Sequence, residues 1–234
     1  MPALLLDGPR DRARSGRIPQ GPGRFARADF DRRDIALDRA GPSWMKISAV
    51  LLAGGESRRM GENKATLLFR GKPLWQIQLE LLRQLELAEI LVSARTDSPW
   101  RPPDVQFIAD DPPSRGPLSG LTASLAGMRG THLLTLAIDM PFMSQTYLRS
   151  LCDQVESGRG VVPMIGDWAE PLAAIYPAHA HVDFLEALSG TVFSLQSLIK
   201  KLLKLGKLRA LNVANEEEML FRNLNDPADL SLLQ

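Results

Sequence analysis

A chain of 234 residues that is 44% hydrophobic and 24% charged has the composition of an ordinary globular protein and is long enough to bury a sizeable core. Its 28 lysines and arginines nearly balance 27 aspartates and glutamates, which argues against nucleic acid or an anionic membrane as a partner. No apolar run approaches the roughly 18 residues of a membrane span. The only cysteine, Cys152, excludes an internal disulfide and fits a cytoplasmic location.

The first part of the chain differs from the rest. Residues 1–45 hold nine arginines, six aspartates and no lysine, show no sustained hydrophobic period, and are interrupted by glycines and prolines. We predict that residues 1–44 form a disordered N-terminal extension and that residues 45–234 form one folded domain. Met45 stands directly before the first predicted strand. An alternative interpretation is therefore that residues 1–44 result from an upstream translation start and have no function.

From residue 46 onward, buried-type strands alternate with amphipathic helices. Strands are predicted, in chain order, at residues 47–53, 89–93, 105–109, 132–138, 160–164, 172–176 and 208–213. Helices are predicted at residues 73–85, 119–128, 144–155, 178–188 and 195–205. Strands separated by helices of this length indicate βαβ units. The expected fold is an α/β, single Rossmann-like domain with a mostly parallel sheet and helices on both faces.

In such sheets ligands bind at the carboxyl ends of the strands, so the residues that follow each strand are informative. The first predicted strand runs into LAGGESRRMGENK, in which Gly54 and Gly55 would let backbone N–H groups approach a phosphate. Arg58, Arg59 and Lys64 add positive charge in the same stretch. The second, third and fourth predicted strands end at SARTD, ADD and IDMP, and these segments supply carboxylates. Glycines, cations and carboxylates at one edge suit phosphates and a metal ion.

The stretch LAGGESRRMGENKA resembles the signature L-A-G-G-x-S-x-R-M-G-x-D-K of the molybdenum cofactor guanylyltransferases, a branch of the nucleotidyltransferases. Further pieces follow in the family's order. They are FIADDPPSRGPLSGL from Phe107, AIDMPFM from Ala137, EPLAAIY from Glu170 and FRNLNDPADL from Phe221. The resemblance covers residues 47–234 and implies that residues 45–234 are a nucleotidyltransferase domain.

The resemblance also implies a role for individual residues. Those expected to bind the nucleotide are Leu52, Ala53, Gly54, Gly55, Lys64, Ser93, Asp110 and Asp139. Those expected to serve catalysis are Lys64, Arg58, Arg59 and Asp139, with Asp139 as the ligand of Mg²⁺. Asn223 and Asn225 are expected near the pterin substrate. Two positions depart from the family's pattern, since Asn63 replaces an aspartate and Ser93 stands where an asparagine is frequent.

Each of these residues also has a structural interpretation when it is considered alone. Asp139 could cap the helix that follows, for which Ser144 is the other candidate N-cap. Asp110 could be an ordinary turn residue, and Asn223 could form hydrogen bonds within a loop. The glycine-rich stretch could be a turn with solvated arginines. The joint occurrence of all these pieces in one order favours the functional interpretation.

The chemistry that the resemblance implies is the transfer of GMP from GTP to the terminal phosphate of molybdenum-molybdopterin, with release of pyrophosphate. Because both reactants are anionic, the protein must screen repulsion and hold an in-line geometry. The Asp110 carboxylate could accept hydrogen bonds from the N1 and N2 edge of guanine. The expected partners are GTP, the molybdenum-molybdopterin cofactor, and cofactor-insertion chaperones or molybdoenzymes that receive the product.

Three alternatives remain open at this point. One is a cytidylyltransferase and another is a sugar-phosphate nucleotidyltransferase, both of the same fold. The third is a protein that binds a nucleotide or cofactor without turnover, for which Asn63 and Ser93 would be the first signs. The intact Lys64 and Asp139 favour an enzyme.

Overall fold

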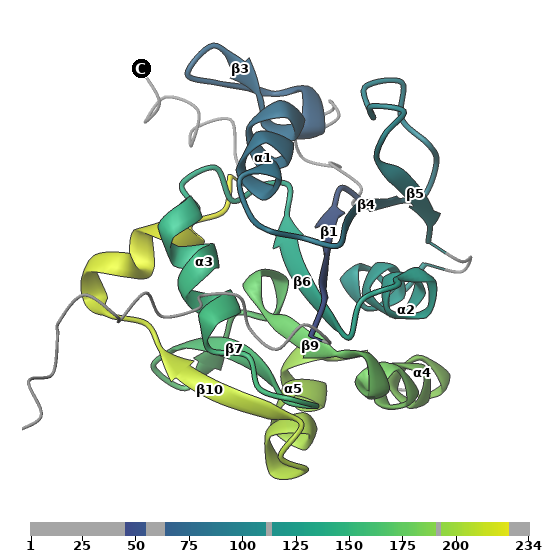
Figure 1. The fold of residues 1–234 in the computed structure, drawn as a ribbon, viewed down its shortest axis with the longest axis vertical. Helices are drawn as coiled ribbons and strands as arrows, with labels where there is room; N and C mark the ends of the chain where they lie inside the picture. The colour runs from purple at the N-terminus through teal and green to yellow at the C-terminus, as the bar shows by residue number, and fades with distance from the viewer. Residues whose placement is uncertain (1–44, 55–63, 111–113, 191–192, 225–234) are drawn as a thin grey trace, which may run out of the picture. The chain divides into compact units, whose positions relative to one another are not determined.

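A computed structural model of the chain describes residues 45–54, 64–110, 114–190 and 193–224 (Figure 1). The predicted N-terminal extension, residues 1–44, lies outside these described residues. So do five positions singled out in the sequence, namely Gly55, Arg58, Arg59, Asn63 and Asn225.

Within the described residues, eight strands form one sheet in the spatial order β10, β7, β9, β6, β1, β4, β5, with β8 paired to β7. Their bounds are β1 Ile47–Leu52, β4 Glu89–Ala94, β5 Gln106–Ala109, β6 His132–Ala137, β7 Gly160–Ile165, β8 Trp168–Ala169, β9 Ile175–Pro177 and β10 Leu208–Asn212. Strands β6, β1, β4 and β5 run parallel, as do β7 and β10, whereas β8 and β9 are antiparallel to their neighbours. The predicted mostly parallel α/β sheet is therefore confirmed.

The central strand β1 has a parallel partner on each side. Its last residue, Leu52, lies opposite Ser93 of β4 and Ala137 of β6. The carboxyl ends of three strands consequently meet at one edge of the sheet, which we call the carboxyl edge.

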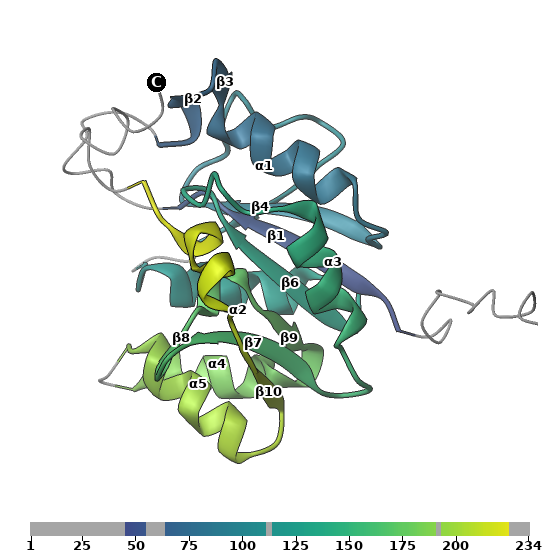
Figure 2. The same ribbon diagram turned by 90° about the vertical axis from the view of Figure 1, so that its left-hand side faces the viewer.

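Helices cover both faces of the sheet, as Figure 2 shows. Because side chains alternate along a strand, Ala49 and Leu51 of β1 join the core of one face and Val50 and Leu52 join that of the other. The first face packs against α1 (Leu74–Arg83) and α3 (Gln145–Asp153). The second packs against α2 (Pro117–Gly127), α4 (His181–Ser189) and α5 (Leu195–Lys204). The near-continuous apolar run of β1 follows from its burial on both sides.

Two predicted segments differ from the structure. The strand expected at residues 172–176 starts late, because the 3-10 turn η2 (Pro171–Ala173) occupies its first half and β9 begins at Ile175. Pro171 opens that turn, where its missing N–H is not needed. The helix expected from residue 178 begins with another 3-10 turn, η3 (Ala178–Ala180), before α4.

Several short elements were not predicted. They are η1 (Lys64–Thr66), η4 (Asn215–Phe221) and a hairpin of β2 (Leu68–Phe69) and β3 (Lys72–Pro73), together with β8. Strands of two residues show no hydrophobic period that a sequence pattern could reveal. None of the helices in the described part of the chain combines the length and apolar character that crossing a membrane requires.

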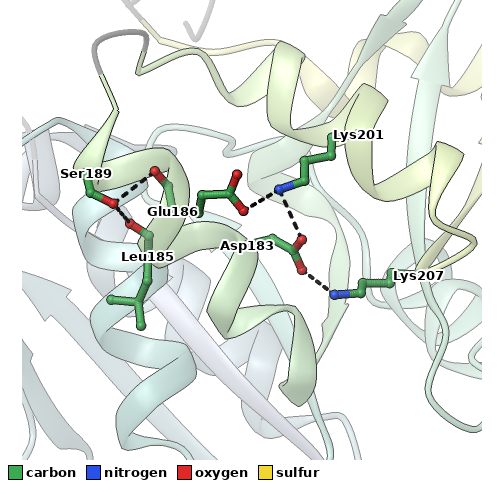
Figure 3. A network of polar contacts seen from close by, with 6 residues as sticks. All are labelled: Asp183, Leu185, Glu186, Ser189, Lys201 and Lys207. Atoms are coloured by element: carbon green, nitrogen blue, oxygen red, sulfur yellow. Dashed lines mark hydrogen bonds and ion pairs between the residues drawn. The ribbon is translucent and has the colours of Figure 1, made fainter.

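A buried carboxylate joins α4, α5 and the turn before β10 (Figure 3). Asp183 of α4 is only 5% exposed; its Oδ2 accepts a hydrogen bond from Lys207, and its Oδ1 forms an ion pair with Lys201 Nζ at 3.4 Å. Lys201 Nζ also lies 2.7 Å from Glu186 Oε2. This network connects elements that otherwise meet mainly through apolar side chains.

Candidate functional site

The structure brings Lys64 and Asp139 together, although 75 residues separate them in the chain. Lys64 opens η1, and Asp139 follows β6 by two residues at the carboxyl edge. The Lys64 Nζ atom donates to Asp139 Oδ2 at 2.8 Å, and the two side chains are 23% and 18% exposed. A cation and a carboxylate therefore lie side by side where the fold class binds its ligands.

Asp139 is not a helix cap. The N-cap of α3 is Ser144, whose hydroxyl oxygen accepts a hydrogen bond of 3.2 Å from the Tyr147 N–H. The structural interpretation of Asp139 is thus wrong, and the prediction of Ser144 as the N-cap is confirmed. The turn after Asp139 is held by Gln78 of α1, whose Nε2 donates to the Met140 carbonyl at 2.7 Å.

Gln78 is a residue that sequence reasoning missed. It is 0% exposed, and its Oε1 has no hydrogen-bond partner among the described residues. The available signal was a glutamine within the apolar face of the predicted helix, between Ile77 and Leu82. Buried amides of this kind usually fix a backbone segment, which here is the turn that follows Asp139.

The predicted backbone contacts at Leu52, Ala53 and Gly54 lie at the end of the central strand. The Leu52 carbonyl accepts from the Ile138 N–H at 3.1 Å, and the Ala53 N–H donates to the Ser93 carbonyl at 2.9 Å. These hydrogen bonds fix the start of the glycine-rich segment against β4 and β6. Gly54 is the first residue that follows them.

Asp110 is a buried carboxylate rather than an ordinary turn residue. It is 9% exposed, and the Ser93 hydroxyl donates to its Oδ1 at 2.7 Å. The Asp110 N–H also donates to the Ala94 carbonyl at 3.0 Å. The Ser93 hydroxyl is therefore directed at Asp110. Its contact with a nucleotide stays a prediction.

Two glycines make room for this carboxylate. A Cβ atom on Gly54 would lie 2.7 Å from Asp110 Oδ2. A Cβ atom on Gly120 of α2 would lie 2.9 Å from Asp110 Oδ1 and 2.8 Å from the Ser93 hydroxyl. Because real side chains do not approach so closely, glycine at both positions lets the carboxylate lie between β1 and the first turns of α2. The N-terminal end of that helix adds positive potential nearby.

On the other side of Asp139, the segment after η4 reaches the carboxyl edge. The Leu224 N–H donates to the Asp139 carbonyl at 2.9 Å, which places the predicted substrate residue Asn223 next to Asp139 in the chain's fold. The Asn223 Oδ1 atom is buried and has no hydrogen-bond partner in the described part of the chain. An unsatisfied buried oxygen is costly and marks a position where a ligand could donate.

Glu170 is a second residue that sequence reasoning did not assign to the site. It precedes η2, is half-buried, and its N–H donates to the Pro163 carbonyl at 2.9 Å. Burial raises the pKa of its carboxyl group. Burial and, after it, the charges of Glu217 and Glu170 raise the pKa of Tyr147 to about 12. The only signal in the sequence was the EPLAAIY piece of the family resemblance.

The carboxyl edge thus assembles a lysine, two carboxylates and glycine-lined backbone on a mostly parallel sheet, which is the arrangement of the nucleotidyltransferase class. A solved structure from Archaeoglobus fulgidus, described as molybdopterin-guanine dinucleotide biosynthesis protein A, is similar with a TM-score of 0.66 and 24% identity, covering 80% of this chain and 96% of that one. A 4-diphosphocytidyl-2C-methyl-D-erythritol synthase from Anaerococcus prevotii has a TM-score of 0.62 at 13% identity, covering 81% and 94%. These two likenesses show the fold.

The chain belongs to the family described as the MobA-like NTP transferase domain, whose model matches residues 49–207. A probable molybdenum cofactor guanylyltransferase from Opitutus terrae is 33% identical over 186 residues, which cover 78% of this chain and 92% of the relative. A protein of the same name from Pelotomaculum thermopropionicum is 30% identical over 190 residues, covering 80% and 91%. The family predicted from the sequence is confirmed.

Proposed function

We propose that this protein transfers GMP from GTP to the terminal phosphate of molybdenum-molybdopterin, which yields the guanine dinucleotide cofactor and pyrophosphate. The observation that carries the proposal is the Lys64 and Asp139 pair at the carboxyl edge of β6, with its 2.8 Å contact. It occurs in a chain whose relatives from two organisms are named probable molybdenum cofactor guanylyltransferases.

The proposed reaction joins two anions, so its barrier is mainly electrostatic. Lys64 would neutralise charge on the triphosphate and on the departing pyrophosphate. Arg58 and Arg59, which precede it in the sequence, are proposed to assist, although they lie outside the described residues. The attacking phosphate is already ionised near neutral pH, so no general base is required. Binding both reactants at one edge supplies the in-line approach.

Asp139 is the proposed ligand of Mg²⁺. Its Oδ2 contacts Lys64, and its side chain is 18% exposed, so the carboxylate is accessible from the edge. In the described part of the chain, no group of three or more His, Cys, Asp or Glu side chains could hold a metal ion. Mg²⁺ fits such a site because it takes most of its ligands from phosphates and water and needs only one or two carboxylates. When bound, it would offset the charge of the triphosphate.

Asp110 is the residue that we propose recognises the base. Guanine presents adjacent N–H donors at N1 and N2, and a carboxylate offers two acceptors. Ser93 holds one oxygen of Asp110 at 2.7 Å and so orients the group. We further propose that the reaction takes place in the cytoplasm and that cofactor-insertion chaperones or molybdoenzymes receive the product.

The proposal is tested by incubating the purified protein with Mg²⁺, molybdenum-loaded molybdopterin and each nucleoside triphosphate in turn. We expect pyrophosphate release with GTP and formation of the guanine dinucleotide. Release with CTP alone would identify a cytidylyltransferase instead. Tight GTP binding with no pyrophosphate release would show a binding protein without turnover, and omission of Mg²⁺ serves as the control for the metal.

A further inference from the structure

The carboxyl edge has two halves, and β6 lies between them. On one side the spatial order continues through β1, β4 and β5; Gly54 follows β1, Ser93 lies near the end of β4, and Asp110 follows β5. On the other side it continues through β9, β7 and β10. Asp139 follows β6 and so stands at the boundary. Because a transfer between two ligands needs both at one centre, the half built on β9 and β7 is the place for the acceptor.

Glu170 lies in this second half and is firmly positioned there. The residue after it, Pro171, has a carbonyl that accepts from Thr135 Oγ1 of β6 at 3.2 Å and from the Tyr176 hydroxyl of β9 at 2.8 Å. The Glu170 N–H is held by Pro163 of β7 at 2.9 Å. Glu170 and the residue after it are thus anchored by hydrogen bonds to three strands of the sheet.

The carboxylate of Glu170, in contrast, lacks a partner within the part of the chain that the structure describes. Among the described residues it forms no hydrogen bond and no ion pair, and its half-burial raises its pKa. Retaining an unpaired, partly desolvated carboxylate destabilises a fold, and such groups are frequently kept for a ligand. The unpartnered Asn223 Oδ1 is a second group of this kind in the same half.

Tyr147 of α3 links the segment of Asn223 to the surroundings of Glu170. Its ring packs edge-on against Phe221, with 5.2 Å between the ring centroids, two residues before Asn223. The charge of Glu170 acts on the hydroxyl of the same tyrosine and helps to raise its pKa. Phe221 and Leu224, which flank Asn223, and Ala173, three residues after Glu170, belong with Tyr147 to the same core cluster, so both segments border one apolar cluster.

We infer that Glu170, anchored at the acceptor half of the carboxyl edge with an unpaired carboxylate, binds the 2-amino-4-oxo edge of the pterin ring of the acceptor, with Asn223 as a neighbouring acceptor. The inference rests on the proposed function. A pterin presents a ring N–H beside an exocyclic amine, and two parallel donors match the two oxygens of a carboxylate. Guanine carries the same edge, so Asp110 and Glu170 would read the same chemical pattern on opposite sides of Asp139.

The test uses two pteridines that differ in this edge. The probes are 2-amino-4-oxopteridine and 2,4-dioxopteridine, which replaces the amine by a second carbonyl, and binding is followed by their fluorescence without any turnover. We expect the wild-type protein to bind the amino compound at least about tenfold more tightly, and Glu170→Gln to lose that preference because an amide offers one acceptor instead of two. Glu218→Gln, on an exposed residue of η4, is the matched control and should keep it.

Two further measurements separate recognition from a structural role. The affinity of Glu170→Gln for GTP should stay within about twofold of wild type, and its melting temperature should equal or exceed that of wild type because a desolvated charge is removed. No preference in the wild-type protein, or an unchanged preference in Glu170→Gln, would overturn the inference.

The outcomes also separate the inference from the proposed function. Pyrophosphate release from GTP by the wild-type protein, with an unchanged pteridine preference in Glu170→Gln, would overturn the role of Glu170 alone. Loss of the preference in Glu170→Gln, with no pyrophosphate release by the wild-type protein, would support Glu170 and overturn the proposed function.

Discussion

The ion pair between Lys64 and Asp139 is partly exposed, and this exposure decides what its loss should do. Pairs of this kind contribute on the order of 0–1 kcal/mol to folding, so removing either partner should leave the fold intact. A charge that stabilises a transition state is worth about 100-fold or more in turnover. We therefore expect Lys64→Ala and Asp139→Ala each to lower the kcat for GMP transfer by at least about 100-fold, with little change in melting temperature.

A matched control for this prediction is the ion pair of Lys72 and Glu80. Its Nζ to Oε2 distance of 2.7 Å is similar to that of the Lys64 and Asp139 pair. Lys72→Ala removes a lysine of the same kind outside the proposed site and should keep wild-type turnover. Wild-type-like turnover in Lys64→Ala or in Asp139→Ala would refute the assignment of the pair.

Ser93 is expected to act through Asp110. Ser93→Ala leaves a buried carboxylate oxygen without this donor, which costs about 1–3 kcal/mol of folding free energy, and allows the carboxylate to turn. We expect a higher KM for GTP and weaker discrimination against other triphosphates, measured by steady-state pyrophosphate release. The control is Ser48→Ala, because Ser48 of β1 donates to Glu89 Oε1 at the same 2.7 Å but lies at the amino end of the strand. A similar loss of GTP discrimination in both variants would contradict the proposed role of Ser93.

His132 gives the fold a defined response to pH. Burial, followed by the charge of His179, lowers the pKa of His132 in the native state. As the pH falls, the histidine of the unfolded chain is therefore protonated first, while the native imidazole is still neutral. The unfolded state then binds more protons, and stability falls as the pH drops below about 6.5. We expect the urea unfolding free energy to decrease between pH 7.5 and pH 5.5, and His132→Asn to flatten this slope. An identical slope in the variant would assign the effect to other groups.

At the scale of elements, the Asp183 network predicts how α4 and α5 hold together (Figure 3). Asp183→Ala removes the buried carboxylate that both Lys201 and Lys207 contact. Hydrogen bonds to charged groups contribute about 1.5–3 kcal/mol, so we expect a loss of about 2 kcal/mol in urea unfolding. Glu186 is 74% exposed at its side chain and contacts the same Lys201, so Glu186→Ala should change stability by less than about 0.5 kcal/mol. Equal losses in both variants would show that burial of Asp183 is unimportant.

Elements could be predicted where their causes are local in the sequence, and not where they depend on tertiary contacts. Strand β1 and helix α1 were predictable because each buries a long apolar pattern, and Ser144 was predictable because an N-cap depends on residues three positions away. The turn η2 was not predictable, because the apolar residues after Glu170 form a pattern that is typical of a strand. Its path is set by Pro171, whose carbonyl is bound by Thr135 and Tyr176 far away in the sequence.

At the scale of the whole molecule, the sheet order explains why only part of the site could be predicted. Lys64 and Asp139 stand in recognisable motifs, so their identity could be predicted, but their contact depends on β1 and β6 being neighbours. That the Glu170 carboxylate has no partner among the described residues depends on the elements packed around it, and it could not be predicted from the sequence. Motifs therefore predicted candidate residues for the nucleotide and, at Asn223 and Asn225, for the acceptor, whereas the tertiary structure was needed to single out Glu170.

The arrangement of the edge also predicts the effect of shortening the chain. Every residue assigned to the site lies at or after Leu52, and the family model begins at residue 49. A protein of residues 45–234 retains β1, which pairs with both β4 and β6. We therefore expect it to have the melting temperature and the kcat/KM for GTP of the full chain, within about twofold. A control that starts at residue 53 lacks the central strand, so β4 and β6 lose their shared partner, and it should not fold cooperatively in urea. A loss of about tenfold or more in kcat/KM for residues 45–234 would instead give the first 44 residues a part in the reaction.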